Sequence, residues 1–219
     1  MRPALPRVIP FALFIAFLAL DGLLAKLAPA LGMDPRWWYG VRTVVVTGLL
    51  LWFWRDYGEL RSFALRPADW LLGIAVGVVV FALWINLDIE PLTLGNGPGF
   101  DARQNGAIAW DLATMRTIGG ALVVPVMEEL FWRSFVMRWV QERRFLELDP
   151  RQVGWKALAV SSAVFAVEHQ LWLAGLVAGL AYGWLYMRTA RLWVPILAHA
   201  VTNGALAGWV LYTGHWEFW

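Results

Sequence analysis

The chain has no cysteine among its 219 residues, and it is poor in charge and in histidine. Without cysteine it can form no disulfide framework and perform no thiol chemistry. Charged residues make up 16% of the chain, against about 25% in an average soluble domain. The formal net charge is only +2, so we expect no nucleic-acid partner.

Apolar and aromatic residues fill the place of the missing charge. Hydrophobic residues make up 60% of the chain, against about 45–50% in soluble domains. The aromatic content of 15% excludes a disordered chain. Many of the sixteen tryptophans stand at the ends of apolar runs, as in the aromatic belts at membrane interfaces. The composition therefore predicts an integral membrane protein.

Seven apolar segments have roughly the length that a membrane span needs, which is about 20 helical residues for a hydrocarbon core of about 30 Å. We predict an all-α polytopic membrane helix bundle of about seven transmembrane segments, within a range of six to eight, forming a single transmembrane domain over residues 1–219. Asp88 to Asn105 is rich in Gly and Pro and is predicted to be a loop. The segments run from about Val8 to Leu31, Trp38 to Trp54, Trp70 to Leu87, Ala107 to Val140, Trp155 to His169, Leu171 to Met187 and Leu192 to Tyr212.

Basic residues indicate the orientation, because Lys and Arg are enriched in cytoplasmic loops. Four basic groups fall on one side if seven segments alternate, and the opposite loops are poorer in basic residues. We predict a cytoplasmic N-terminus and a C-terminus on the opposite side of the membrane. The groups are Arg2 and Arg7; Arg55, Arg61 and Arg66; Arg138, Arg143, Arg144, Arg151 and Lys156; and Arg188 and Arg191.

The first segment has a second interpretation. Arg2 and Arg7, the apolar run Val8 to Leu20 and the small residues at 28–30 imitate a cleavable signal peptide. Asp21 and Lys26 interrupt that pattern, and they favour a retained helix whose polar groups face the bundle. Cleavage would leave six spans.

The fourth segment carries ionisable residues, which are functional candidates inside a membrane because their insertion is costly. Glu129 and Arg133 are four residues apart, so they lie on one helical face and can form an ion pair. Glu128 points about 100° away from Glu129 and is left without this cation. Pro125 is expected to kink the helix just before the acidic pair. One carboxylate is therefore predicted to be structural and the other available.

Two later segments add polar groups. His169 ends an apolar run that contains Phe165, and His199 and Asn203 share one face of the last segment. Each of these on its own fits a packing histidine or an interhelical hydrogen bond. Together with the glutamates they match a hydrolase, because a carboxylate and an imidazole can deprotonate water while an imidazole and an amide can bind an oxyanion.

These residues resemble the CAAX protease and bacteriocin-processing family of intramembrane proteases, which includes the type II CAAX prenyl endopeptidases. The family motifs E-E-x-x-x-R, F-x-x-x-H and H-x-x-x-N occur here in order. They are Glu128, Glu129 and Arg133, then Phe165 and His169, then His199 and Asn203, within about residues 122–211.

The resemblance implies that Glu128, assisted by His169, activates a water molecule for attack on a peptide bond. His199 and Asn203 would bind the oxyanion, and Glu129 and Arg133 would hold the helix. It also raises a zinc alternative with Glu128, His169 and His199 as ligands. We expect no cofactor, because the chain lacks the H-E-x-x-H spacing of helical zinc proteases.

The expected substrate is a peptide or a membrane-anchored protein within the lipid bilayer. The segments Val124 to Phe135 and Gly175 to Tyr186, with the Trp-rich ending Trp216 to Trp219, resemble a bacterial subgroup found with exosortase systems. This resemblance implies a location in the bacterial inner membrane and exosortase-system proteins as partners. Two alternatives remain at this stage: a transporter or proton relay that uses the same carboxylates and histidines, and a non-catalytic family member that acts as a scaffold.

The depths of the two histidines pose a problem for a common site. At about 1.5 Å per helical residue, His199 lies about 10 Å from the basic end of its segment, whereas His169 lies about 20 Å from Lys156. A shared site requires the fifth helix to be short, tilted or extended on the cytoplasmic side, or the segment that follows to be re-entrant.

Overall fold

The computed structural model describes residues 3–91, 93 and 99–219. The described chain is all-α apart from a two-stranded antiparallel hairpin, β1 (Arg103–Gln104) with β2 (Ala107–Ile108). The hairpin corrects the predicted start of the fourth segment, since Ala107 lies in a strand. Part of the predicted loop, residues 92 and 94–98, lies outside the described residues.

The described residues form seven helical segments, which confirms the predicted all-α membrane helix bundle. The fourth is one long run in which α-helix alternates with two wider π-helical stretches, Gly119–Val123 and Leu130–Met137. The helices are α1 (Leu5–Leu27), α2 (Trp37–Trp52), α3 (Pro67–Trp84), α4 (Trp110–Ile118), α5 (Val124–Glu129), α6 (Arg138–Gln141), α7 (Trp155–Val167), α8 (Trp172–Thr189) and α9 (Trp193–Thr213).

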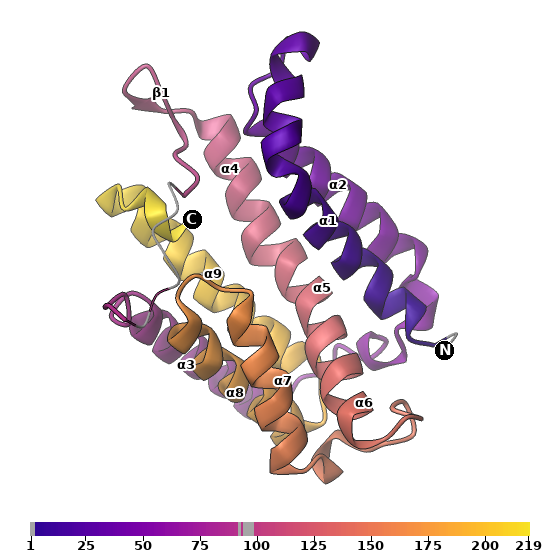
Figure 1. Ribbon diagram of the computed structural model, residues 1–219. Coiled ribbons are helices and arrows are strands. Elements are labelled where there is room, and N and C mark those ends of the chain that lie inside the picture. Colours follow the sequence, from indigo (N-terminus) through magenta and orange to yellow (C-terminus); the bar gives the residue numbers. More distant parts are fainter. Residues whose placement is uncertain (1–2, 92, 94–98) are drawn as a thin grey trace.

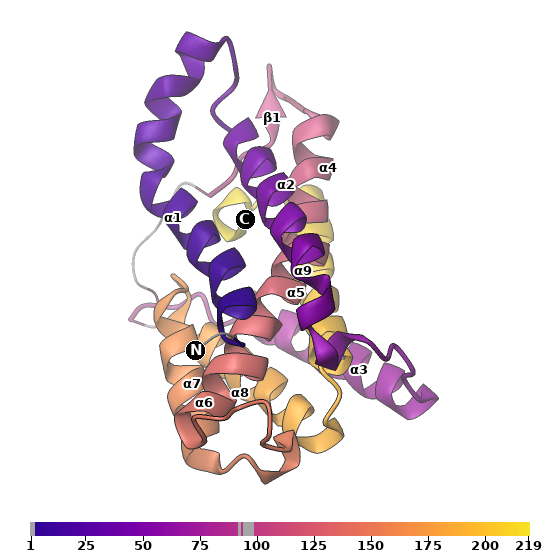
Figure 2. The ribbon, with the colours of Figure 1, turned by 90° about the vertical axis from the view of Figure 1, so that its right-hand side faces the viewer.

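Three stretches among the described residues are long and apolar enough to cross a membrane: Leu5–Leu31, Pro67–Trp84 and Trp193–Thr213. Figures 1 and 2 show α1 and α2 side by side along the run formed by α4 and α5. Leu20, Leu23 and Leu71 are exposed on α1 and α3, as expected of side chains that face lipid.

Helix α7 does not follow the predicted pattern of a full span. Its 13 residues extend about 20 Å, which is short of the hydrocarbon thickness of about 30 Å. Helix α8 returns beside it, so the turn at residues 168–171 lies part of the way along the length of α9 (Figure 1). The short fifth helix provides the condition that a site shared by His169 and His199 requires.

Glycines bring α3 and α9 into close contact. A Cβ atom built at Gly77 would lie 2.5 Å from the carbonyl oxygen of Ala198 and 2.8 Å from the Cβ atom of Val201. Any side chain at Gly77 would therefore force the two helices apart. Small residues at such crossings are the usual means by which membrane helices approach closely, and here the crossing fixes the part of α9 that carries His199.

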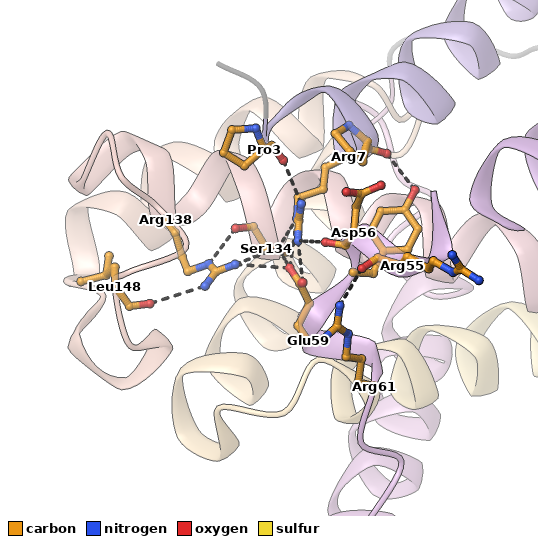
Figure 3. Close-up of polar contacts among 11 residues, drawn as sticks. Pro3, Arg7, Arg55, Asp56, Glu59, Arg61, Ser134, Arg138 and Leu148 are labelled. Atoms are coloured by element: carbon orange, nitrogen blue, oxygen red, sulfur yellow. Dashed lines mark hydrogen bonds and ion pairs between the residues drawn. The ribbon is translucent and has the colours of Figure 1, made fainter. Parts of the chain in front are cut away.

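The described members of the four basic groups predicted to share one side lie at one end of the bundle, and Arg2 lies outside the described residues. Arg7 and Arg138 both contact Glu59, Arg151 donates to the carbonyl of Thr189, and Arg191 donates to the carbonyl of Ala64. Figure 3 shows Arg7 and Arg138 converging on Glu59 and Ser134. We call Arg7, Glu59, Ser134 and Arg138 the basic-end cluster.

Helix α1 packs into the bundle at this end. Arg7 is 1% exposed, and the ring of Phe11 stacks on Phe131 with their centroids 3.8 Å apart. We expected Asp21 and Lys26 of α1 to face the bundle. This was wrong for Lys26, which is exposed, and it holds in part for Asp21, whose carboxylate approaches Arg42.

Candidate active site

The two glutamates lie on α5, between the two π-helical stretches. Pro125 cannot donate a backbone hydrogen bond, so the helix is already open at the start of α5. Such local widening is frequent at functional sites, because it turns side chains away from the regular helical positions. We expected a kink at Pro125, and the structure has a π-helical stretch, Gly119–Val123, that ends just before α5.

Glu129 is fully buried and holds two partners. Its Oε2 atom lies 3.2 Å from Nε of Arg133, which is the ion pair expected from their spacing. Its Oε1 atom accepts a hydrogen bond from Nδ1 of His199 at 3.0 Å. The carboxylate therefore ties α5 to α9 and fixes the ring of His199 with Nε2 pointing away from Glu129.

Glu128 differs from its neighbour in having room around it. Its Oε2 atom has no hydrogen-bond partner among the described residues. This oxygen lies 4.0 Å from Nε2 of His199. Glu128 is thus buried and, as the spacing predicted, it is Glu129 and not Glu128 that pairs with Arg133.

His199 is held from a second side by Tyr182 of α8. The two rings stack with centroids 4.9 Å apart and an interplanar angle of 21°. The Tyr182 hydroxyl donates to Oγ1 of Thr202 at 2.7 Å, and that oxygen donates to the carbonyl of Gly77 at 2.9 Å. Sequence reasoning missed both residues. The only sequence signal for either residue was the position of Thr202. It lies three residues after His199 and therefore on the same side of α9.

His169 lies in the turn after α7. Its Nδ1 atom donates to the carbonyl oxygen of Phe165 at 2.9 Å, and its ring packs between Phe165 and Trp84, with centroids 4.6 Å and 5.4 Å away. With Nδ1 protonated, a neutral ring keeps the lone pair of Nε2 available as an acceptor. The ring of Phe165 also lies beneath the guanidinium of Arg133, at 4.5 Å, so the predicted supporting residues contact each other.

Asn203 extends from α9 toward the first π-helical stretch. Its Nδ2 atom donates to the carbonyl oxygen of Gly120 at 2.8 Å. The second hydrogen on Nδ2 and the acceptor Oδ1 have no protein partner among the described residues. The amide is therefore oriented by the helix and still able to donate.

One cavity of about 290 Å³ collects these groups. Glu128, His169, His199 and Asn203 all line it, whereas Glu129 packs behind His199 and does not. Three stretches of chain separated by about 30 to 40 residues thus meet at one site. Glu168, which lies exposed in the same turn as His169, also lines the cavity and was not singled out from the sequence.

The zinc alternative does not fit this arrangement. Among the described residues, no three His, Asp or Glu side chains gather closely enough to hold a metal ion. We therefore derive no step through a metal.

Comparison with known proteins agrees with the motifs. Residues 110–205 match the family model described as type II CAAX prenyl endopeptidase Rce1-like. A protein of Bacillus subtilis (strain 168) named "Putative membrane peptidase YdiL" is 26% identical over 129 residues, which cover 58% of this chain and 50% of that protein. The alignment thus spans half the length of this curated relative, and no solved structure matches the chain. The matched region contains all three motifs, and over it the chain is similar to the type II CAAX prenyl endopeptidases.

Proposed function

We propose that the chain is a glutamate-dependent intramembrane endopeptidase that hydrolyses a peptide bond of a membrane-associated substrate without a metal. The observation that carries this proposal is the shared cavity, which Glu128, His169, His199 and Asn203 line together. The related family of membrane peptidases supports it. Buried polar groups with a purely structural role would pack against one another and leave no cavity between them.

The first step uses the unpartnered carboxylate. Glu128 accepts a proton from a water molecule while Nε2 of His169 accepts the hydrogen bond from the other hydrogen, and the water oxygen attacks the peptide carbonyl carbon. His169 is suited to this role because Phe165 already holds its Nδ1 proton. Acid–base catalysis of this kind contributes about 10²–10⁴-fold to a rate.

The second step concerns the oxyanion. A protonated His199 donates from Nδ1 to Glu129 and has a second donor, Nε2–H, that points toward Glu128 and the cavity. Asn203 supplies its free N–H beside it. These donors stabilise the tetrahedral oxyanion. The intermediate then collapses, and protonated Glu128 returns its proton to the leaving amine nitrogen.

The experiment is digestion of a peptide library by the purified full chain in detergent, with products identified by mass spectrometry. We expect new termini with the wild type and none with Glu128→Gln or His169→Ala at equal folded concentration. Glu147→Gln is the matched control, because Glu147 is an exposed carboxylate paired with Arg144 far from the cavity. Uptake of a solute into proteoliposomes without cleavage would contradict the proposal and favour a transporter.

We also propose that the basic end of the bundle faces the cytoplasm of a bacterial cell. The absence of cysteine allows a direct test, because a single introduced thiol can be labelled. Arg143→Cys at the basic end and Gln104→Cys in the hairpin are both exposed positions. In intact cells an impermeant maleimide is expected to reach only Gln104→Cys. Labelling of Arg143→Cys alone would reverse the orientation.

A further inference from the structure

The residues that follow α9 fold back over the catalytic cavity. We call residues 215–219 the aromatic segment. Two of its rings, those of Phe218 and Trp219, line the cavity that Glu128 and His169 also line. The family match ends at residue 205, before this segment begins. A part of the chain outside the matched region therefore forms one wall of the proposed reaction site.

On one side the aromatic segment packs against the end of α9. The ring of His215 stacks on that of Trp209, with centroids 5.2 Å apart and an interplanar angle of 10°, and the ring of Phe218 meets Trp209 edge-on at 5.0 Å. Within the segment, Nδ1 of His215 lies 2.7 Å from Oε1 of Glu217. Trp209 belongs to the last turn or two of α9, which ends at Thr213. The aromatic segment is thus carried by the helix that precedes it.

On its other side the aromatic segment meets residues 99–103, at the start of the hairpin, along a seam. Among the described residues one hydrogen bond crosses this seam, from the backbone N–H of Phe100 to the carbonyl of Trp219 at 3.0 Å. The guanidinium carbon of Arg103 lies 5.5 Å from the ring centroid of Trp216. Trp216 is buried, but its indole N–H has no partner in the described chain. A buried donor without a partner raises the free energy of the closed seam, so the seam is held only weakly.

Gly99 allows the two sides of the seam to meet. A Cβ atom built there would overlap the carbonyl oxygen of Trp216 and lie 2.8 Å from Cα of Glu217, and both of these are backbone atoms. A side chain at Gly99 is therefore incompatible with the closed seam. Its φ of 66° also favours glycine. Gly106 of the hairpin has a similar φ of 82°, but nothing lies within 4 Å of the place of its Cβ atom. Gly106 thus offers the same backbone strain without the clash.

The seam lies between the cavity and the hairpin end of the bundle. The guanidinium carbon of Arg116 on α4 is 5.9 Å from a ring centroid of Trp219, so the aromatic segment reaches across from α9 to α4 (Figure 1). Arg103 and Gln104 of the hairpin are exposed, and exposed polar side chains of this kind are expected in water rather than in lipid. The aromatic segment therefore covers the cavity at the end that faces water.

We propose, as a refinement that rests on the proposed function, that the aromatic segment is a lid on the catalytic cavity. It parts from residues 99–103 to admit water and peptide, and it closes again on Phe100 while the bond is cut. Opening breaks one backbone hydrogen bond and gives the indole N–H of Trp216 access to water, so the open and closed states are close in free energy. Lids of this kind exclude bulk water and commit a bound substrate. Phe218 and Trp219 thus control access and take no part in the chemistry.

The first test measures access to the cavity without using cleavage. Ala207 of α9 lines the cavity and is 2% exposed, and the chain has no cysteine of its own, so Ala207→Cys places a single thiol inside. A cationic methanethiosulfonate should label this thiol in the purified full chain about tenfold faster when Gly99→Ala holds the seam open, because an open state of at most about 10% becomes the major one. Gly106→Ala is the matched control and should leave the rate unchanged. Trp219→Ala, which removes a ring at the seam, is a second opening variant.

A reversible cross-link provides the opposite change and separates a lid from a fixed wall. The rings of Phe100 and Trp219 face each other across the seam with centroids 6.2 Å apart, so Phe100→Cys and Trp219→Cys can be joined by a short bis-methanethiosulfonate. We expect the joined protein to lose peptide cleavage and to regain it when the link is reduced. Gln104→Cys with Ala107→Cys, at paired positions of the hairpin, is the matched control and should cleave whether joined or not.

Equal labelling of Ala207→Cys in the Gly99→Ala and Gly106→Ala backgrounds overturns the proposal. Should Gly99→Ala fail to fold, Trp219→Ala takes its place, and equal labelling there has the same meaning. The two proposals also fail separately. Faster labelling of the opened variants in a protein that cuts no peptide would refute the proposed function alone. Cleavage that continues unchanged in the joined protein would refute the lid alone and leave the aromatic segment as a fixed wall.

Discussion

The basic-end cluster and the cavity are both built from buried charged residues, but they differ in how fully those charges are partnered. All three guanidinium nitrogens of Arg7 donate to protein oxygens: Nε to Glu59 and Ser134, Nη1 to the carbonyl of Pro3, and Nη2 to Glu59 and the carbonyl of Asp56. At the cavity, Glu128 and Arg42 each have atoms without partners among the described residues.

This difference separates structural charge from reactive charge. A fully hydrogen-bonded network rigidifies the fold and has no capacity left for a ligand. A buried carboxylate or guanidinium with free positions raises the free energy of the empty protein, and a substrate or water molecule that fills those positions lowers it. Glu129 is a structural charge, because it accepts a hydrogen bond from His199 and pairs with Arg133, although its Oε2 atom makes no hydrogen bond among the described residues. Glu128, the next residue in the chain, lines the cavity instead.

Glu129→Gln is expected to have the largest effect on stability and cleavage activity taken together. It leaves Arg133, which is 1% exposed, without its carboxylate, and breaking a buried pair in this way costs about 3–5 kcal/mol. The ring of His199 also loses its anchor, so the activity per folded molecule should fall as well. The measurements are the melting temperature in detergent and the peptide cleavage rate. An unchanged melting temperature would show that Glu129 is not a structural charge.

Glu59→Gln tests the other side of the comparison. Arg7 and Arg138 both lose their acidic partner, so we expect a loss of about 1.5–3 kcal/mol, the range for hydrogen bonds to charged groups. The rate constant for cleavage should stay within about twofold of the wild type, because the basic-end cluster does not line the cavity. A loss of activity without a loss of stability would contradict the assignment of this cluster as structural.

Tyr182→Phe is expected to have a smaller effect on stability. It removes the hydrogen bond to Thr202, worth about 0.5–1.5 kcal/mol, but it keeps the ring that stacks on His199. We expect a lower melting temperature and a cleavage rate close to that of the wild type. Tyr182→Leu, which removes the stacking as well, should lower the rate. Equal rates in both variants would show that the stacking does not position His199.

The smallest expected effect is the change with pH in the stabilisation that the basic-end cluster contributes. Burial raises the pKa of Glu59, but the hydrogen bonds and the charge of Arg7 outweigh it and hold the pKa below its ordinary value of 4.5. Because the folded pKa is the lower one, the stabilisation is present above pH 4.5 and is lost as the pH falls through the folded value. The difference in melting temperature between the wild type and Glu59→Gln should therefore shrink in acid. A constant difference would contradict this.

Much of this arrangement could be predicted from the sequence, because its signals are local. Apolar runs gave the seven helical segments, and the spacing of Glu129 and Arg133 gave their ion pair. The short α7 was one of the conditions stated for a site shared by His169 and His199. Its actual length is set by the residue at which the helix ends, Val167. No capping residue in the sequence marks that end.

The contacts that could not be predicted are those between residues distant in sequence. Arg7 and Glu59 are 52 residues apart, and Arg42 reaches the cavity only because α2 packs along α4. Tyr182 lies in an apolar helix and gains its importance from the ring of His199 on the next one. No local pattern predicts such contacts, since they follow from how the helices pack rather than from how each one forms.

The rate at which purified Glu128→Gln protein cleaves peptides, compared with the wild type at equal folded concentration, tests the central claim most directly. We expect the rate to fall about 10²–10⁴-fold while the melting temperature stays within a few degrees of the wild type. A variant that cleaves within about threefold of the wild-type rate would contradict the assignment of Glu128 as the residue that activates water.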